Sequence, residues 1–286
     1  MSDRLQRTTD VDRPASTKLC RVPVTRVGRP GLPEDAAAIE EPLEIRLHGT
    51  AFAVIMRTPG DDRALAAGFL LSEGVIAGGA DLGAVEHCKH PDRPESHNVV
   101  DVYLIGESAK TLRDRLDGRR RVTTTSACGL CGRVTIESLR LRASPLARRW
   151  TMSREVAARL PAELRTRQDA FEETGGLHAA GLFTPDGTHE RTAEDVGRHS
   201  AVDKVIGAML LEERLPLDGY ALAVSGRTSF EIVQKAWIAG IGLVCAVSAP
   251  TSLAIELANE AGITLLGFTR DGGFNVYSHP GRIAGL

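Results

Sequence analysis

The sequence predicts an α/β fold in which a layered domain with a mixed, largely parallel sheet follows a smaller N-terminal α+β subdomain. The 286 residues are 42% hydrophobic and 25% charged, a composition typical of a folded globular protein. The second half alternates short apolar runs with amphipathic helical patterns, whereas the first third contains a hairpin pattern. We therefore expect a flexible leader over residues 1–38, the subdomain over 39–125 and the layered domain over 126–286.

The sequence pattern of the first 125 residues predicts a few strands and one helix. The leader mixes charges with prolines, and only Cys20–Val27 has the pattern of a short strand. In the subdomain, Asp61 or Asp62 is a candidate N-cap for the helix that follows the hairpin. The expected elements are strands over Glu44–Gly49 and Phe52–Arg57, a helix over Arg63–Ser72 and a strand over Asn98–Ile105.

The layered domain is predicted mainly by its last third. Residues Trp150–Glu173 look helical, and a later helix would bury Val202, Val205, Ile206 and Met209 along one face. A β-α-β-α-β order then predicts parallel strands joined by right-handed crossovers. Its strands are expected over Ala221–Val224, Gly242–Val247 and Thr264–Phe268, and its helices over Phe230–Ala239 and Ser252–Ala261.

Three turns at the ends of these strands are candidate ligand sites, because ligands of parallel sheets gather at the carboxyl edge. They are Ser225–Ser229, Ser248–Ser252 and Thr269–Gly273. Their hydroxyls and backbone amides, together with Arg227 and Arg270, would suit phosphate groups. For any single turn, ordinary helix capping is the favoured explanation, with Thr228 and Glu231 as a capping box. Three turns on one edge favour a nucleotide-like ligand.

A Cys-x-x-Cys loop at Cys128 and Cys131 is the strongest chemical signal in the chain. A helix-like run over Val134–Leu141 and the arginines before the loop would lower both thiol pKa values and favour a nucleophilic sulfur. A zinc site would need further ligands from distant parts of the chain. A zinc-dependent base deaminase would also need a His-x-Glu motif, which the sequence lacks.

The remaining polar clusters include His178 in one segment and Arg198 and His199 in another. They would line a ligand or sulfur-transfer pocket. The structural alternative is that Asp195 caps the helix after it and that Asp203, four residues from His199, orients the imidazole. Both interpretations stay open from the residues alone.

Composition and charge indicate which partners and which cellular compartment to expect. A net charge of −2 gives no basic footprint for nucleic acid, and no apolar run is long enough for a clean membrane span. The amino terminus has no secretory pattern, so we expect a cytoplasmic protein with reduced thiols. Among its five cysteines, Cys245 lies in an apolar run and is expected to be a core residue.

A family resemblance rests on short stretches that follow one another along the chain: Glu40–Glu44, Met56–Asp62, Gly68–Gly74, Ser126–Gly132, Thr174–Ala180, Glu194–Lys204, Ser225–Lys235, Val247–Leu253 and Gly267–Pro280. In these stretches the sequence resembles the formate dehydrogenase accessory sulfurtransferases, the FdhD-type sulfur carriers. The resemblance covers almost everything beyond the leader. It implies a larger domain similar to the cytidine deaminase fold.

The resemblance also implies a function. Such a carrier takes sulfane sulfur from a cysteine desulfurase and passes it to bis(molybdopterin guanine dinucleotide), the molybdenum cofactor of a formate dehydrogenase. By position, Cys128 would carry the persulfide and Cys131 would assist. The cofactor segment would comprise Phe268, Thr269, Arg270, Asp271, Gly272 and Gly273, and the residues that would join it are Ser225, Arg227, His178, Arg198 and His199.

Two other function classes remain as alternatives to the sulfur carrier. One is a zinc-dependent, deaminase-like hydrolase, and the other is a chaperone that binds the cofactor without covalent chemistry. The expected partners are the desulfurase, the catalytic subunit of the formate dehydrogenase and the guanine-dinucleotide cofactor. A second copy of this chain is a further candidate partner.

Overall fold

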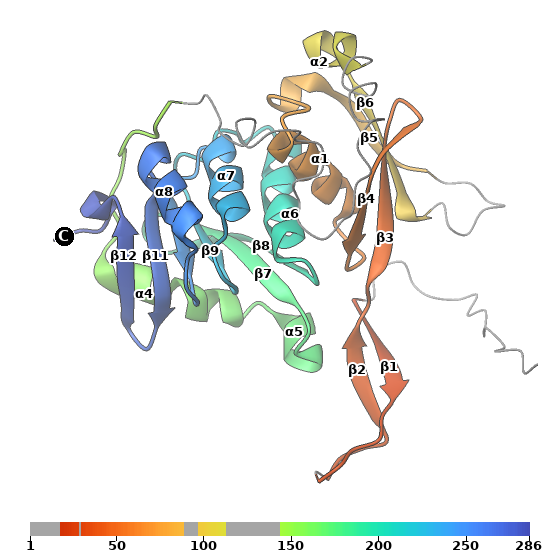
Figure 1. Ribbon diagram of the computed structural model, residues 1–286, viewed down its shortest axis with the longest axis horizontal. Coiled ribbons are helices and arrows are strands. Elements are labelled where there is room, and N and C mark those ends of the chain that lie inside the picture. The colour runs from red at the N-terminus through yellow and green to blue at the C-terminus, as the bar shows by residue number, and fades with distance from the viewer. Residues whose placement is uncertain (1–17, 29, 89–96, 113–143) are drawn as a thin grey trace, which may run out of the picture.

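The computed structural model describes residues 18–28, 30–88, 97–112 and 144–286, and every structural statement below concerns these residues. They form a mixed α/β fold with two main sheets and a two-stranded ribbon (Figure 1). The predicted α/β class is confirmed. The boundary expected at residues 125 and 126 lies outside the described ranges, so the division into domains stays a prediction.

The N-terminal part contains a ribbon and a small sheet. The ribbon of β1 and β2 is antiparallel and projects from the rest of the molecule (Figure 1). The sheet has the order β4-β3-β6-β5, with β4 at one edge. The elements are β1 (Leu19–Pro23), β2 (Glu34–Ala38), β3 (Glu41–Leu47), β4 (Thr50–Arg57), α1 (Asp62–Ser72), η1 (Gly79–Asp81), β5 (Leu82–His87), β6 (Val99–Leu104) and α2 (Gly106–Lys110).

The C-terminal part is built on a six-stranded sheet of order β12-β11-β10-β9-β7-β8. The elements are α4 (Arg154–Arg165), α5 (Asp169–Thr174), β7 (His178–Phe183), β8 (His189–Asp195), α6 (Arg198–Leu211), β9 (Ala221–Val224), α7 (Phe230–Ala239), β10 (Leu243–Ala246), α8 (Ser252–Ala261), β11 (Thr264–Arg270), β12 (Gly273–Ser278) and η4 (Pro280–Arg282).

The predicted β-α-β-α-β unit is confirmed, because β9, β10 and β11 are parallel neighbours joined by α7 and α8. The sheet continues on both sides with antiparallel strands. On one side β12 pairs with β11, and on the other β7 pairs with both β9 and β8. Parallel pairing is therefore confined to the middle of a mixed sheet.

Helices cover both faces of this sheet (Figure 1). On one face, α4 packs on strand residues such as Phe183, Leu243 and Cys245 in a compact apolar cluster. On the other face, α6, α7 and α8 share a larger core that continues into α1 and the four-stranded sheet. The two sheets are thus joined by one continuous core.

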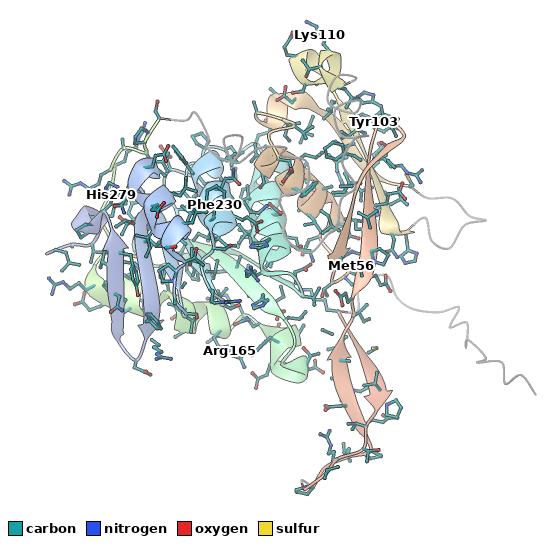
Figure 2. The ribbon with its side chains drawn as sticks, viewed as in Figure 1. Met56, Tyr103, Lys110, Arg165, Phe230 and His279 are labelled. Carbon is teal, nitrogen blue, oxygen red and sulfur yellow. The ribbon has the colours of Figure 1, made fainter. Side chains whose placement is uncertain are left out.

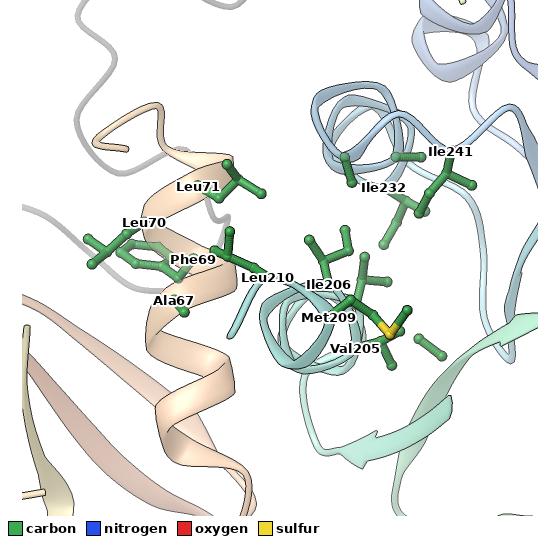
Figure 3. Packing of buried hydrophobic residues seen from close by; sticks show 14 of the residues in the cluster. Ala67, Phe69, Leu70, Leu71, Val205, Ile206, Met209, Leu210, Ile232 and Ile241 are labelled. Atoms are coloured by element: carbon green, nitrogen blue, oxygen red, sulfur yellow. The ribbon is translucent and has the colours of Figure 1, made fainter. Parts of the chain in front are cut away.

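The junction between the two parts is the packing of α1 against α6 (Figure 3). The backbones approach closely because both helices carry glycine at the crossing. A Cβ at Gly68 would lie 2.0 Å from the carbonyl oxygen of Asp203, and one at Gly207 would lie 1.9 Å from that of Ala64. Neither position accepts a side chain without separating the helices.

Buried ion pairs reinforce the same junction. The Lys204 ammonium lies 2.8 Å from the Asp195 carboxylate and donates to the Thr58 carbonyl oxygen at 2.8 Å. The Lys235 ammonium binds both oxygens of Asp203, which also accepts from the Ser72 hydroxyl at 2.8 Å. Thr58 and Ser72 belong to the N-terminal part, so each ion pair connects α6 to that part.

Several helix ends differ from the sequence-based expectation. Asp61 is the N-cap residue of α1, but its side chain makes no cap hydrogen bond, and Asp62 instead forms a bidentate pair with Arg57. The proposed Thr228 and Glu231 capping box is wrong, since Ser229 precedes α7 and makes no side-chain cap. The pattern over 150–173 becomes two helices, because α4 ends at Arg165 and α5 begins at Asp169.

Other elements were not expected from the sequence, among them β2, β5, β7, β8, β12 and the short α2. The expected strand near Cys20 is present as β1. The described residues contain no helix that combines the length and the apolar character needed to cross a membrane.

We predict that Gly207→Ala destabilises the protein, although alanine favours a helix by about 1 kcal/mol over glycine. The new methyl group would collide with the Ala64 carbonyl oxygen and force α1 away, so the free energy of unfolding should fall by about 3 kcal/mol. Thermal unfolding followed by circular dichroism measures this. The control is Gly219→Ala, where no atom lies within 4 Å of the added Cβ. Equal melting temperatures for the two variants would contradict the close packing.

Candidate functional site

A large cavity lies at the carboxyl edge of the parallel strands. Its volume is about 1020 Å³, and its walls include Ser225 after β9, Val247 after β10 and the segment 269–272 at the end of β11. Helices α4 and α5 close the opposite side, where Arg165 lies on α4 (Figure 2). Residues of the first and third predicted turns therefore lie at one cavity.

A buried polar side chain without a hydrogen-bond partner lines this first cavity. Thr269 is fully buried, and its hydroxyl has no hydrogen-bond partner among the described residues. Gln168 is also buried in the same wall. A buried polar group is costly without a partner, so the Thr269 hydroxyl points to a polar ligand.

The third turn contributes a cation and a strained backbone. Phe268 and Asp271 both have positive φ angles, of 52° and 53°, in the tight connection from β11 to β12. The Arg270 guanidinium lies 6.0 Å from the centroid of the Phe268 ring. Among the predicted segment, residues 269–272 line the cavity, whereas Phe268 and Gly273 do not.

Helix α5 is held against this cavity by a buried carboxylate. Glu194 at the end of β8 accepts hydrogen bonds from the backbone amides of Ala170 and Phe171, at 3.2 and 2.8 Å. Arg165 lies over the Phe171 ring, 4.7 Å from its centroid. Phe171 in the first turn of α5 and Arg165 at the end of α4 thus bring an aromatic face and a guanidinium to the cavity wall.

A second cavity of about 560 Å³ lies between β4 and the amino terminus of α6. Its apolar wall is formed by Ala51–Met56 and Phe69, and Met56 marks the end of that wall in Figure 2. Its polar wall contains Arg198, His199 and Ser200. His178 lines both cavities, so the two sites meet at this side chain.

The surroundings of His178 favour its neutral form. Burial, followed by the charges of Arg198 and His199, lowers the pKa of the His178 imidazole below its ordinary value. Gly226 lies against the same ring, since a Cβ there would be 3.2 Å from His178 Nδ1. The strand-end turn after β9 and the start of α6 therefore converge on one histidine.

His199 is oriented by α7 and not by Asp203. Its Nε2 lies 2.7 Å from a Glu231 carboxylate oxygen and 3.0 Å from the Ser229 hydroxyl. Asp203 binds Lys235 instead. Asp195 likewise is no cap for α6, because its carboxylate is committed to Lys204 and to the backbone amides of Gly197 and Thr58. Both structural alternatives drawn from spacing are thus wrong.

The remaining single-residue predictions concern Arg227, the cysteine pair and the core residue Cys245. Arg227 is exposed and lines neither cavity. Cys128 and Cys131 lie outside the described residues, so their placement stays a prediction. Cys245 is buried as expected, and burial raises the pKa of its thiol to about 12.

Sequence reasoning missed the walls that α4, α5 and β4 contribute. Gln168 and Phe171 were read only as parts of a long helix, and β4 only as half of a hairpin. One local feature of the sequence could have indicated these walls. The apolar alternation over 150–173 breaks at Arg165–Asp169, and such a break turns the next residues toward a new surface.

Comparison with known proteins now identifies the family. A model described as the FdhD/NarQ family matches residues 38–284. The chain belongs to this family. It is 48% identical over 253 residues to the sulfur carrier protein FdhD of Mycolicibacterium paratuberculosis, covering 87% of this chain and 92% of the relative. It is 45% identical over 252 residues to the sulfur carrier protein FdhD of Saccharolobus solfataricus, covering 87% and 91%. The resemblance stated from sequence motifs is confirmed.

A solved structure agrees with the fold. The crystal structure of a putative formate dehydrogenase accessory protein from Desulfotalea psychrophila has a TM-score of 0.70 to this chain at 26% identity. The match covers 93% of this chain and 98% of the other. The fold similarity thus extends over almost the whole chain. The specific likeness to a cytidine deaminase stays a prediction.

We predict that Arg198→Gln raises the pKa of His178 toward its ordinary value, because it removes a neighbouring positive charge. In the wild type, His178 protonation opposes folding, so its contribution to stability is complete above the ordinary pKa and is lost as the pH falls through the lowered value. Titration of the imidazole signals by NMR measures the change. Arg227→Gln is the control, since Arg227 has no part in the His178 shift. Identical titration curves for both variants would contradict this electrostatic coupling.

Proposed function

We propose that this protein is a sulfur carrier that takes sulfane sulfur from a cysteine desulfurase and transfers it to bis(molybdopterin guanine dinucleotide) for a formate dehydrogenase. Its membership in the FdhD/NarQ family supports this class, as do relatives named sulfur carrier proteins. The observation that carries the binding part of the proposal is the first cavity, whose wall contains the buried Thr269 hydroxyl without a hydrogen-bond partner among the described residues.

The first cavity suits a guanine dinucleotide, which is here a substrate. Its volume is that of a site for a large ligand, and its wall combines apolar surface with a few polar groups. Gln168 has an amide donor and acceptor that match the hydrogen-bonding edge of a purine, and Phe171 has an aromatic face. Arg270 and the turn it belongs to lie at the strand ends, where phosphate groups are commonly bound.

The covalent step would belong to Cys128. Its thiolate would attack the outer sulfur of the desulfurase persulfide, forming a new S–S bond while the desulfurase cysteine leaves as a thiolate. The sulfur then resides on Cys128 as a persulfide until it is delivered. Cys131 would assist this exchange. The described groups that would receive the cofactor lie at the first cavity, and His178 separates them from the second cavity.

We predict that incubation with a cysteine desulfurase and cysteine adds sulfur to the wild-type protein, as measured by intact mass spectrometry. Cys128→Ala should abolish the adduct, whereas Cys88→Ala should retain it, because burial and nearby carboxylates raise the pKa of the Cys88 thiol. Treatment with a reductant should remove the adduct. A wild-type protein that gains no reducible sulfur would overturn the carrier function, and cofactor binding without sulfur loading would favour the noncovalent chaperone.

We predict that Thr269→Val weakens the binding of guanosine diphosphate by about tenfold, since it removes a buried hydroxyl from the cavity wall. Isothermal titration calorimetry measures the affinity. Thr228→Val is a matched control, because Thr228 is also fully buried with an unpartnered hydroxyl but lines neither cavity. Equal losses in both variants would show that the first cavity is not the nucleotide site.

A further inference from the structure

We propose that the second cavity binds a tetrahedral oxyanion, free phosphate or a phosphate group of an organic molecule, at the amino terminus of α6. The site would use the backbone amides of Arg198, His199 and Ser200, the Ser200 hydroxyl and the Arg198 guanidinium. This inference stands apart from the proposed sulfur transfer, because it rests on the geometry of the second cavity alone.

The first turn of α6 has free amide donors. The helix spans 14 residues, and its first intrahelical hydrogen bond runs from the Ala201 amide to the Gly197 carbonyl oxygen at 3.0 Å. The amides of residues 198–200 donate to no group in the described parts of the chain. Gly197 at the N-cap provides no side-chain cap, so these donors face the cavity with the positive end of the helix dipole.

Ser200 is an independent sign of a ligand. It is 6% exposed and lines the second cavity, yet its hydroxyl forms no hydrogen bond with any described residue. In a capping box, a Glu or Gln at this third position reaches back to the N-cap amide. That amide already donates to Asp195 at 2.8 Å. A Cβ at Gly197 would lie 2.9 Å from Ser200 Oγ, so the free hydroxyl stands beside the uncapped turn.

Arg198 supplies an uncompensated positive charge. Its Nε is buried without a hydrogen-bond partner, and it forms no ion pair within the described ranges. Its neighbours in the wall are already neutralised: Lys235 pairs with Asp203, and the His199 imidazole binds Glu231. Glu40 is the remaining carboxylate of the lining and lies exposed at the rim. An anion at the α6 turn would therefore complete the charge balance of the cavity.

The opposite wall indicates what accompanies the anion. The cavity is far larger than one phosphate, and β4 gives it an apolar side through Phe52, Ile55 and Met56. A phosphomonoester with an apolar or planar group would contact both walls. Inorganic phosphate would contact only the α6 turn.

The test follows backbone amide shifts of the ¹⁵N-labelled full chain during titration with sodium phosphate and, separately, with phenyl phosphate. We expect saturable shifts at residues 197–200, and tighter binding of phenyl phosphate if the β4 wall contributes. Equal affinities would restrict recognition to the phosphate group. Ser200→Ala and Arg198→Met should each weaken phosphate binding by about tenfold. Thr269→Val should bind phosphate normally, which separates this result from the nucleotide site.

The matched control is Ser252→Ala at the first position of α8, a helix whose N-terminus is capped by the Thr251 side chain. It should leave the phosphate affinity unchanged. Three results would overturn the proposal: no saturable shift at residues 197–200, equal shifts at the start of α8, or undiminished affinity in both the Ser200→Ala and the Arg198→Met variants. Amide spectra of the variants show directly whether each one is folded.

Discussion

The close contact between α1 and α6 is the constraint on which the rest of the structure depends. Glycine at Gly68 and Gly207 lets the helix backbones touch, and the contact joins the four-stranded sheet to the six-stranded sheet in one core. Dense packing of this kind has a fixed geometry, because small shifts open voids on one side and collisions on the other. The position of α6 is therefore fixed from two directions, by its own sheet and by α1.

The packing of α1 against α6 also positions the candidate site, because the amino end of α6 forms one wall of the second cavity. The buried Lys204 binds Asp195 at the end of β8 and the Thr58 carbonyl oxygen just beyond β4. Removing either charged partner alone would leave the other buried without compensation, a loss that costs about 3–5 kcal/mol. The gap between β4 and the first turn of α6 is consequently a fixed distance rather than a loose groove. The second cavity lies between these two elements, which the Lys204 contact links just beyond the end of β4.

Sequence reasoning predicted the parts of the fold that local patterns determine. Apolar runs and helical periodicity located β9, α7, β10, α8 and β11, and the topology of such units placed Ser225 and Thr269 on one edge. Sequence reasoning could not predict contacts between side chains that are distant in the sequence. His199 binds Glu231, which is 32 positions away in sequence, and spacing alone favoured the wrong partner, Asp203. The wall that α5 contributes to the first cavity was missed for the same reason. Its position depends on Glu194 of β8, which accepts a hydrogen bond from the α5 backbone although the two elements are separate in sequence.

Charge pairing explains how a chain with a net charge of −2 can offer sites for anions. The buried lysines are unavailable to a ligand, because Lys204 and Lys235 are each bound to an aspartate at 2.8 Å. Their role is to neutralise carboxylates that would otherwise repel an anion near α6. Among the described residues of the cavity walls, the arginines without an ion pair are Arg159 and Arg270 in the first cavity and Arg198 in the second. Between them stands His178, whose pKa is lowered by burial and by the charges of Arg198 and His199, which favours the neutral imidazole. In the binding proposed above, a neutral His178 would contribute a hydrogen bond to a ligand in either cavity, and the arginines would contribute the charge.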